Sequence, residues 1–443
     1  MINYLFTKTP LVFLVQSLWR DEAFSYFLAK KNILQIVFLT AKDFNPPLYY
    51  LLLHFWMKFF GSSEIALRIF SLLAFWATLY IIYLILTEIL RISSKKSFIY
   101  LLFFLFNPLL LCYAFEVRMY SLFAFFATAC FYAFYRKKKW LYFTTTLLGL
   151  YTHYFMFFAV ASQLIYLVIL KKNKIKTSIS IKSIIPPLVF FIPWIIYVSK
   201  MVTTSGSFWI AAPNLIEIFY LPAFIFTGYE LAHNYLPVAK DGTVHSLIYL
   251  SLVLLVVTIA GYFQIKKKNK KEISSLFYYL AIWGLGIPLA VFFISFIKPI
   301  FLPRYLIFTT VGLFLLLIVS FKALPKLLQL ITLFLLVITI FYSFTLKTTF
   351  QTKANMRETI GEIKKLANKD DLLYVTSELD YLLGQYYFDE NRVYIYGKTY
   401  EEIPNYVGKV LISKDAIVTS LPRYPKKAFI LKSDQTYDIQ AVF

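Results

Sequence analysis

The sequence predicts a polytopic α-helical membrane protein with about eleven transmembrane helices and a small α/β domain at the C-terminal end. The chain of 443 residues is 60% hydrophobic and 20% aromatic, and its mean hydropathy is +0.67. No soluble domain of that length buries so much apolar surface. Its lysines and arginines gather in short tracts between apolar runs, which is typical of the cytoplasmic loops of membrane proteins.

The formal net charge of +22 would suggest nucleic-acid binding in a soluble protein. Its placement indicates membrane topology instead, so no nucleic-acid partner is expected. The basic tracts lie at residues 91–96, 136–139, 171–182 and 266–271. The two cysteines, Cys112 and Cys130, both fall within apolar runs and offer no disulfide or metal framework.

The apolar runs predict the order of the spans. The first helix, over residues 2–18, is short and is interrupted by Lys8 and Pro10. No cleavable signal peptide is expected, because Trp19-Arg20-Asp21-Glu22 stands where a small-residue cleavage site should be. The further predicted spans are 65–90, 97–113, 119–135, 140–153, 154–170, 184–199, 245–264, 273–297, 305–321 and 327–346. With the basic tracts inside, the N-terminus is predicted to be cytoplasmic and the C-terminus extracytoplasmic.

Two long outer loops interrupt the predicted transmembrane module of residues 1–346. The first, residues 19–64, contains helical patterns over 23–40 and 47–60. The second of these patterns is predicted to lie along the interface, because it is shorter than a span and carries two polar side chains. The second outer loop is 200–244, where an apolar stretch over 214–226 is also expected to lie in the interface.

The composition changes after the last predicted span. Residues 350–443 are charge-rich and are predicted to form the extracytoplasmic α/β domain. Strand-like runs occur at 372–376, 393–396, 409–412 and 428–431, with a helical segment near 378–387. Neither an internal repeat nor a glycine-rich phosphate loop is recognisable.

Five polar clusters fall at the predicted outer ends of the helices. They are Asp21-Glu22, Asp43-Phe44-Asn45-Pro46-Pro47, Glu116-Val117-Arg118-Met119-Tyr120, Thr152-His153-Tyr154 and Pro303-Arg304-Tyr305. One interfacial arginine or histidine is more often an anchor than a site, and two adjacent carboxylates can be a solvated helix start. Five clusters on one face of so apolar a chain favour a site, in which carboxylates lie beside cations. Such a site suits an anionic lipid substrate and a proton to be removed.

Three runs carry a resemblance to a known group of proteins. They are Trp19-Arg20-Asp21-Glu22-Ala23-Phe24-Ser25, then residues 45–53 with the sequence NPPLYYLLL, and then residues 60–71 with the sequence FGSSEIALRIFS. Together they resemble the N-terminal signature of membrane glycosyltransferases of the GT-C fold. The closest group is glycosyltransferase family 39, with the protein O-mannosyltransferases and aminoarabinose transferases. The match covers about residues 17–90, and the remainder agrees in layout.

The resemblance implies an enzyme that takes a sugar from a polyprenyl-phosphate carrier, with inversion, on the outer face of the membrane. The acceptor would be a hydroxyl of a protein, a glycan or a lipid. The resemblance makes Asp21 the catalytic carboxylate and Glu22 its partner, and Asp43 matches an acidic residue of the mannosyltransferase branch. Asn45 departs from the pattern, because many relatives have His or Lys before the double proline. This departure leaves the sugar open.

The chemistry of such a transfer fits these residues. A phosphate leaving group is stable as an anion, so the site needs a base for the acceptor's proton and fixed cations for the phosphate. Asp21 is the candidate base. The candidates for the donor phosphate are Arg304, Arg118, His153 and Tyr305, with Asp43, Asn45 and Glu116 in support. An arginine is favoured over a lysine for its forked donors.

Two other classes remain as alternatives. A transporter would be expected to carry broken helices and charges near the bilayer midplane, whereas this chain keeps its charges at span ends. A lipid-linked polysaccharide polymerase or ligase uses similar donors but would not be expected to place an acidic pair directly after the first span. No cofactor is expected, and dependence on a divalent metal stays open. The C-terminal domain either binds the acceptor or packs on the loops.

Overall fold

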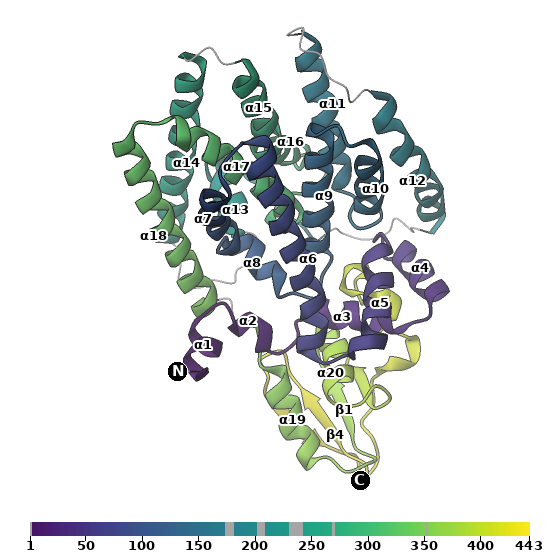
Figure 1. Cartoon of the computed structure of the whole chain (residues 1–443). Coiled ribbons are helices and arrows are strands. Elements are labelled where there is room, and N and C mark those ends of the chain that lie inside the picture. The colour runs from purple at the N-terminus through teal and green to yellow at the C-terminus, as the bar shows by residue number, and fades with distance from the viewer. Residues whose placement is uncertain (1, 173–180, 202–208, 230–241, 268–270, 351–352) are drawn as a thin grey trace.

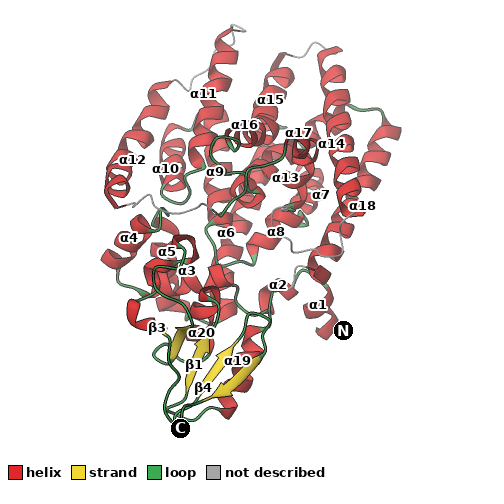
Figure 2. Cartoon of the chain, turned by 180° about the vertical axis from the view of Figure 1, so that it is seen from behind, coloured by secondary structure: helices red, strands yellow, loops and turns green. Residues whose placement is uncertain are grey.

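The computed structural model describes residues 2–172, 181–201, 209–229, 242–267, 271–350 and 353–443. Long helices stand side by side in one bundle, and all the strands gather at one end of it, where the C-terminus lies (Figure 1). The view from behind shows the same division between a helical body and a terminal sheet (Figure 2).

Six helices in the described ranges are long and apolar enough to cross a membrane, which confirms the polytopic helical character. They are Glu64–Ile89, Lys182–Met201, Leu247–Lys267, Ile273–Ile294, Pro303–Ala323 and Lys326–Thr345. A seventh is formed if α7 (Ser94–Leu105) and α8 (Pro108–Ala114), which meet at 73°, count as one span. The bend follows from Asn107, whose Oδ1 accepts the Leu110 N–H at 2.8 Å and starts a new helix there.

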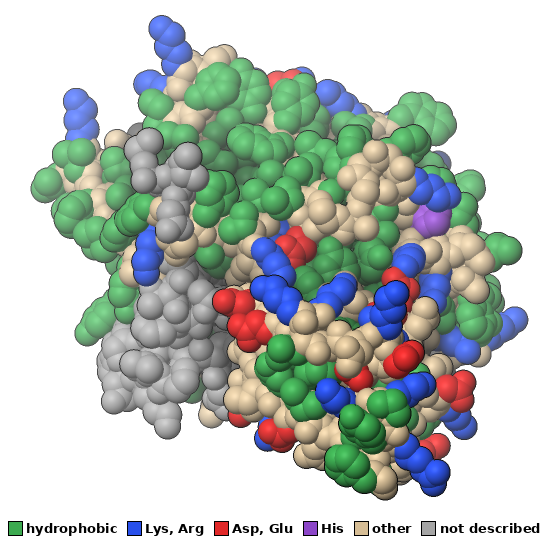
Figure 3. All heavy atoms as spheres, turned by 90° about the horizontal axis from the view of Figure 1, so that it is seen from below, with side chains coloured by type: hydrophobic (Ala, Val, Ile, Leu, Met, Phe, Trp, Pro, Cys, Tyr) green, Lys and Arg blue, Asp and Glu red, His purple; other side chains and the backbone are tan. Residues whose placement is uncertain are grey.

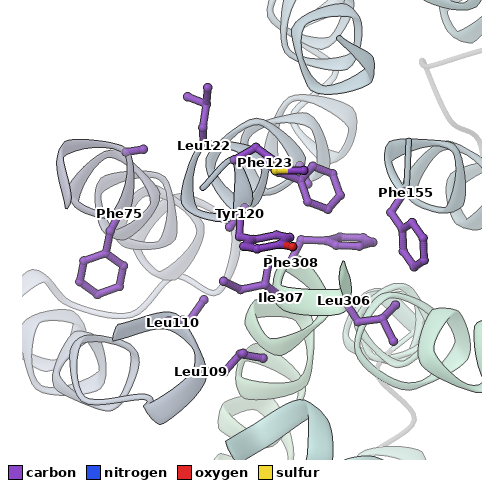
Figure 4. Packing of buried hydrophobic residues seen from close by; sticks show 14 of the residues in the cluster. Phe75, Leu109, Leu110, Tyr120, Leu122, Phe123, Phe155, Leu306, Ile307 and Phe308 are labelled. Atoms are coloured by element: carbon purple, nitrogen blue, oxygen red, sulfur yellow. The ribbon is translucent and has the colours of Figure 1, made fainter. Parts of the chain in front are cut away.

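The other predicted spans correspond to shorter helices. These are α9 (Tyr120–Tyr135), α10 (Lys139–Leu150) and α11 (Met156–Lys172). Helix α9 is buried along nearly its whole length and lies against α6 (Glu64–Leu84), α10 and α17 (Ile307–Ala323). Figure 4 shows the aromatic packing at its outer end, where Phe123 approaches Phe308 from α17.

The remaining long segments are α12 (Ile181–Met201), α14 (Gly242–Lys267), α15 (Lys271–Ala281), α16 (Ile287–Ile294) and α18 (Lys326–Phe350). A π-helical turn continues α6 through Ile85–Ile89, and another, Ile282–Gly286, joins α15 to α16. Trp283 in that second turn stacks on Phe131 of α9, with ring centroids 3.9 Å apart.

The N-terminal segment differs from the single helix predicted over residues 2–18. It forms α1 (Ile2–Lys8) and α2 (Val12–Val15), and neither is among the candidate spans. Pro10 lies in the break between them. Proline has no N–H to continue a helical ladder, so the interruption seen in the sequence ends the helix.

The predicted first outer loop, residues 19–64, consists of three helices. They are α3 (Arg20–Lys30), α4 (Ile33–Lys42) and α5 (Leu48–Phe60). The single helix predicted over residues 23–40 is wrong in one respect: Asn32 caps α4 by accepting the Gln35 N–H at 2.9 Å, and so divides it in two. Helix α5 agrees with the prediction.

The second outer loop is described only in part. The apolar stretch predicted over 214–226 forms a 3₁₀ helix, Leu215–Tyr220, and α13, Leu221–Thr227. Residues 202–208 and 230–241 of this predicted loop lie outside the described residues.

The C-terminal unit is a five-stranded sheet in the order β3-β2-β1-β4-β5. Its strands are β1 (Leu372–Val375), β2 (Val393–Tyr396), β3 (Ile417–Val418), β4 (Ala428–Leu431) and β5 (Tyr437–Gln440). All pairs are parallel except β4 with β5, and Leu373 lies opposite both Val393 and Phe429. Helices α19 (Met356–Leu366) and α20 (Tyr381–Tyr387) accompany the sheet.

Three predicted strands and the helix near 378–387 are present in this sheet. The strand predicted at 409–412 is wrong, because Lys409–Leu411 is a 3₁₀ helix that follows Gly408. Gly408 has φ +79°, which turns the chain out of an extended course. The sequence analysis missed α19, β3 and β5.

The C-terminal unit packs directly on the first outer loop. The Leu18 N–H donates to the Tyr387 hydroxyl at 2.7 Å, and the Tyr386 hydroxyl donates to the Ser62 carbonyl at 2.8 Å. Helix α20 also contacts α3. The unit therefore supports the helix that begins with the acidic pair.

Candidate active site

The start of helix α3 sends its two carboxylates in different directions. Trp19 is extended and precedes the helix, and its N–H donates to Glu22 Oε2 at 2.7 Å. Glu22 thus folds back over the helix end in the manner of a capping box. Asp21 is one position earlier and points about 100° away around the helix axis. Carboxylates in this first turn are also favoured by the helix dipole.

Glu22 is fully buried and is the centre of an ionic cluster. Arg68 meets it with two parallel bonds, Nε to Oε1 at 2.9 Å and Nη2 to Oε2 at 2.8 Å. Lys353 Nζ lies 2.8 Å from Oε2, and the Val117 N–H donates to Oε1 at 3.2 Å. Burial would raise the pKa of Glu22, but Lys353 and Arg68 together lower it to about 2. Glu22 is therefore a charged, fully paired group.

Arg68 ties the surrounding chain to this cluster. Besides Glu22, its guanidinium donates to the carbonyls of Leu14 (2.9 Å), Gln16 (2.6 Å) and Ser17 (3.0 Å). Arg68 and Lys353 were not predicted from the sequence as members of the site. Arg68 gave a signal, since it is a lone charge near the outer end of an apolar run, but Lys353 looked like any lysine after a span.

Asp21 lies on the open side of the helix. Its side chain is 44% exposed, and its described ion pair is with Arg118, whose Nε is 3.9 Å from Oδ2. The Arg118 side chain is only 11% exposed. In the described part of the chain, Arg118 Nε and the hydroxyl of Tyr50 are buried without a hydrogen-bond partner. This side of α3 consequently has unused hydrogen-bonding capacity beside an accessible carboxylate.

Asp43 and Asn45 form a tight turn after α4. Asn45 Nδ2 donates to Asp43 Oδ2 at 2.6 Å, and the intervening Phe44 has φ +55°. Burial raises the pKa of Asp43 to about 7, with Asp21 adding to the rise and Asn45 and Arg118 opposing it. The positive charge of Arg118 therefore acts on both carboxylates, Asp43 and Asp21.

Arg304 and Tyr305 approach the same region from the start of α17. The Arg304 guanidinium lies over the Trp209 ring, 5.1 Å from its centroid. The Tyr305 ring is 6.1 Å from that of Tyr120, and both residues are in electrostatic reach of Asp21, Arg118 and Arg304. The outer end of α17 therefore supplies a cation and a phenol to the site.

His153 is packed between aromatic rings and is not a cation. Its ring stacks on Phe123 at 4.7 Å and lies 5.2 Å from Tyr305. The Phe155 N–H donates to His153 Nδ1 at 3.1 Å, and Figure 4 shows Phe123 and Phe155 in this packing. His153 lies in the turn between α10 and α11, and burial lowers its pKa to about 3. It can offer a neutral Nε2–H donor but no charge for a phosphate, contrary to the expectation of a cation.

Glu116 lies between the ionic cluster of Glu22 and the residues around Arg304. Its carboxylate lies 4.0 Å from Lys353 Nζ and in electrostatic reach of Arg304. Burial raises the pKa of Glu116, and the charge of Lys353 opposes this rise. All nine residues expected from the sequence therefore gather around the start of α3, with Asn45 present through its bond to Asp43. In the described residues, no group of three or more His, Cys, Asp and Glu side chains is arranged to hold a metal ion.

Comparisons with known proteins agree with the resemblance seen in the sequence. The family model described as "Dolichyl-phosphate-mannose-protein mannosyltransferase" matches residues 45–197. The crystal structure of ArnT from Cupriavidus metallidurans in the apo state is similar with a TM-score of 0.61 and 11% identity, over 96% of this chain and 91% of that chain.

A second structure of ArnT from the same organism is bound to undecaprenyl phosphate. It matches with a TM-score of 0.58 and 12% identity, over 98% of this chain and 93% of that chain. No curated protein sequence matches the chain. The similarity over nearly the whole of both chains confirms the GT-C-like helical fold expected from the sequence.

Proposed function

We infer that this chain is a membrane glycosyltransferase of the GT-C fold, which moves a sugar from a polyprenyl-phosphate donor to an acceptor hydroxyl on the outer face. The family match, over residues 45–197, includes Asn45, Glu116, Arg118 and His153 of the candidate site. A similar fold, that of ArnT, has been seen with undecaprenyl phosphate bound. Both observations support a polyprenyl-phosphate-linked sugar as donor.

One observation carries the assignment of the site. Asp21 is an accessible carboxylate next to Arg118, a buried arginine whose Nε has no hydrogen-bond partner among the described residues, while the adjacent Glu22 is saturated with partners. An exposed acid beside a cation with a free hydrogen-bond donor is what a transfer from an anionic carrier requires. We assign Asp21 as the base and Glu22 as the group that holds the start of α3.

The reaction forms one bond and breaks one. The acceptor oxygen attacks the anomeric carbon from the side opposite the phosphate, and the bond between that carbon and the phosphate oxygen breaks, so the configuration inverts. The acceptor's proton passes to the Asp21 carboxylate. The polyprenyl phosphate leaves as an anion, and we assign its stabilisation to Arg118 and Arg304, with Tyr305 and the neutral His153 as donors. Asp43, Asn45 and Glu116 support these groups.

The proposed arrangement in the membrane follows the sequence. A transmembrane module of residues 1–346, with the ten spans predicted from residue 65 on and outer loops at 19–64 and 200–244, would carry an extracytoplasmic unit of residues 350–443. The basic tracts from residue 91 on would then lie in the cytoplasm. The N-terminal helix α1 lies at the same end of the bundle as the C-terminal unit (Figure 1), so the cytoplasmic N-terminus expected from the sequence does not fit this arrangement. A cysteine at position 389 should react with an impermeant reagent from outside the cell only. Reaction from the cytoplasm would reverse the topology.

The purified chain should release free polyprenyl phosphate from a polyprenyl-phosphate sugar. Arg304→Lys should weaken donor use, because a lysine replaces two parallel donors by one mobile charge. Lys298 is an exposed cation nearby in sequence, and Lys298→Ala is the matched control with little expected effect. Absence of release over the candidate donors would contradict the proposal, and equal effects of the two substitutions would remove Arg304 from the donor site.

A further inference from the structure

A pocket of about 320 Å³ lies between the start of α3 and the C-terminal unit. Its wall includes Trp19 and Arg20, which lead directly into Asp21. Met356 and Asp380 from the C-terminal unit close it on the other side. The volume falls in the range of small-molecule sites, at the lower end. The mechanism above uses none of these four side chains.

The lining of the pocket is electrically neutral. Arg20 and Asp380 are its charged residues, and they pair with each other through Nε to Oδ1 at 2.9 Å and Nη2 to Oδ2 at 3.3 Å. The Asp380 side chain is 2% exposed and that of Arg20 is 27% exposed. A phosphate or carboxylate would therefore meet a cation that is already neutralised. The pocket favours an uncharged ligand.

The rim of the pocket offers polar groups that the protein leaves unused. Ser433 and Gln435 lie on the turn between β4 and β5, and their side chains make no hydrogen bond within the described part of the chain. Gln435 has φ +71°, in the left-handed region that few residues other than glycine adopt. The turn is held by the Gln435 N–H, which donates to the Lys432 carbonyl at 3.0 Å. Strained, fixed residues of this kind concentrate at ligand sites.

We propose that this pocket is an acceptor subsite that takes a neutral sugar ring. A sugar ring has an apolar C–H face and an edge of hydroxyl groups. The indole of Trp19 and the thioether of Met356 suit the face. The planar Asp380 and Arg20 pair, with Gln435 and Ser433, suits the hydroxyl edge.

The position of the pocket fits this role, which rests on the proposed function. Its wall continues along the chain into the candidate base, so an acceptor glycan seated here would bring a further hydroxyl to Asp21. Seen from below, the C-terminal end of the molecule presents cationic, anionic and apolar side chains interspersed (Figure 3). A peptide would be the alternative neutral acceptor, and the experiment separates the two.

The test uses the full chain in detergent and three probes: methyl glycosides of neutral hexoses, glucuronic acid and a serine-containing peptide. Gln435→Trp fills the pocket, and Gln440→Trp places the same side chain at an exposed position of β5 outside the lining. Saturation-transfer NMR should show glycoside binding that weakens about tenfold or more in Gln435→Trp and is unchanged in Gln440→Trp. Ser433→Trp serves as a second pocket-filling variant if the first does not fold.

Donor turnover distinguishes failure of the subsite from failure of the proposed function. Hydrolysis of the donor by water should be equal in the wild type and both variants, while transfer to the glycoside should fall only in Gln435→Trp. Glycoside binding that is absent, or equal in both variants, would overturn the subsite, as would binding of the peptide or the acid alone. If the wild type binds glycosides here but never turns over a polyprenyl-phosphate sugar, the proposed function fails and the sugar site stands.

Discussion

The two sides of the first turn of α3 show opposite solutions to the same problem of a carboxylate near a membrane. On one side, Glu22 is fully buried and receives bonds from Arg68, Lys353 and two backbone N–H groups. On the other, Asp21 is 44% exposed and faces Arg118 at 3.9 Å. The first side is saturated, and on the second the buried Arg118 Nε has no hydrogen-bond partner in the part of the chain that the structure describes.

This difference separates structure from chemistry within a dipeptide. A buried carboxylate with every lone pair engaged holds its neighbours in place, and it has no capacity left for a substrate. An accessible carboxylate opposite a guanidinium whose Nε makes no hydrogen bond in the described residues can take a proton while an anion binds the cation. Substitutions on the side of Asp21 should therefore lower the rate of transfer, and substitutions on the side of Glu22 should lower the stability of the fold.

The largest effect is expected on the rate of transfer from Asp21→Asn. Asparagine keeps the size of the side chain but cannot accept the acceptor's proton, so turnover should fall roughly 10²–10⁴-fold. The measurement is release of polyprenyl phosphate under saturating donor, together with thermal unfolding. Unfolding should stay close to that of the wild type, since Asp21 is half-exposed.

Near-normal turnover by Asp21→Asn would sink the assignment of the base and would make Asp43 the next carboxylate to test. Asp389→Asn is the matched control, because Asp389 is a carboxylate of the C-terminal unit whose side chain is 36% exposed and which pairs locally with Arg392 at 3.2 Å. It should leave both the rate and the unfolding temperature unchanged.

Arg68→Met should act mainly on stability. It removes the bidentate partner of Glu22 from a fully buried site, and breaking a buried pair from one side typically costs about 3–5 kcal/mol. Denaturant unfolding in detergent should show this loss. A variant as stable as the wild type would mean that Lys353 alone neutralises Glu22. The bonds from Arg68 to Glu22 would then contribute little to the stability of the fold.

Lys353→Met should cost less, because Arg68 still holds both oxygens of Glu22. A hydrogen bond to a charged group contributes roughly 1.5–3 kcal/mol. Lys353→Arg keeps the charge and should restore most of the loss. If Lys353→Met lowered turnover strongly with unfolding unchanged, Lys353 would belong to the chemistry of the open side through Glu116 rather than to the saturated cluster.

The smallest effect is a dependence of stability on pH that comes from Asp43. Its pKa is raised from 3.8 to about 7 by burial, so the folded state binds the proton more tightly than the unfolded state. That contribution is fully present below about pH 4 and is lost as the pH rises to about 7 and beyond. The unfolding temperature of the wild type, relative to that of Asp43→Asn, should therefore fall by a few degrees between pH 5 and 8.

His153 gives an opposite slope below its unfolded value of 6.5, since burial lowers its pKa to about 3. That slope is common to the wild type and to Asp43→Asn, so comparing the two proteins isolates Asp43. If the difference in unfolding temperature between the two proteins stayed constant over this pH range, Asp43 would be more exposed to solvent than its turn with Asn45 implies.

Much of this arrangement could be predicted because it depends on patterns within short stretches of the sequence. The long spans follow from apolar length, α5 from its paired prolines, and β1, β2 and β4 from short apolar runs. Pro10 and Asn32 divided predicted helices, because a missing N–H and a side-chain cap act locally and override a continuous apolar pattern.

The partners of the carboxylates could not be predicted in this way. Asp21 and Glu22 have similar side chains in one dipeptide, and only the tertiary contacts to Arg68 and Lys353 show which of them is saturated. His153 looked like a possible cation, but its aromatic surroundings come from α9 and α17, far apart in sequence. Residue type gives the capacity for chemistry, and the packing around it decides the charge state.

The contact between Glu22 and Lys353 joins positions 331 residues apart, which has a consequence for biosynthesis. At about 5–20 residues per second, the ribosome needs roughly 15–65 seconds between making one partner and the other. Arg68 emerges only 46 residues after Glu22, so the nascent acid is neutralised early by its first cation. The second cation arrives after the last predicted span has been made. In a chain that ends before residue 353, the helix that carries the candidate base would lack the ion pair between Glu22 and Lys353.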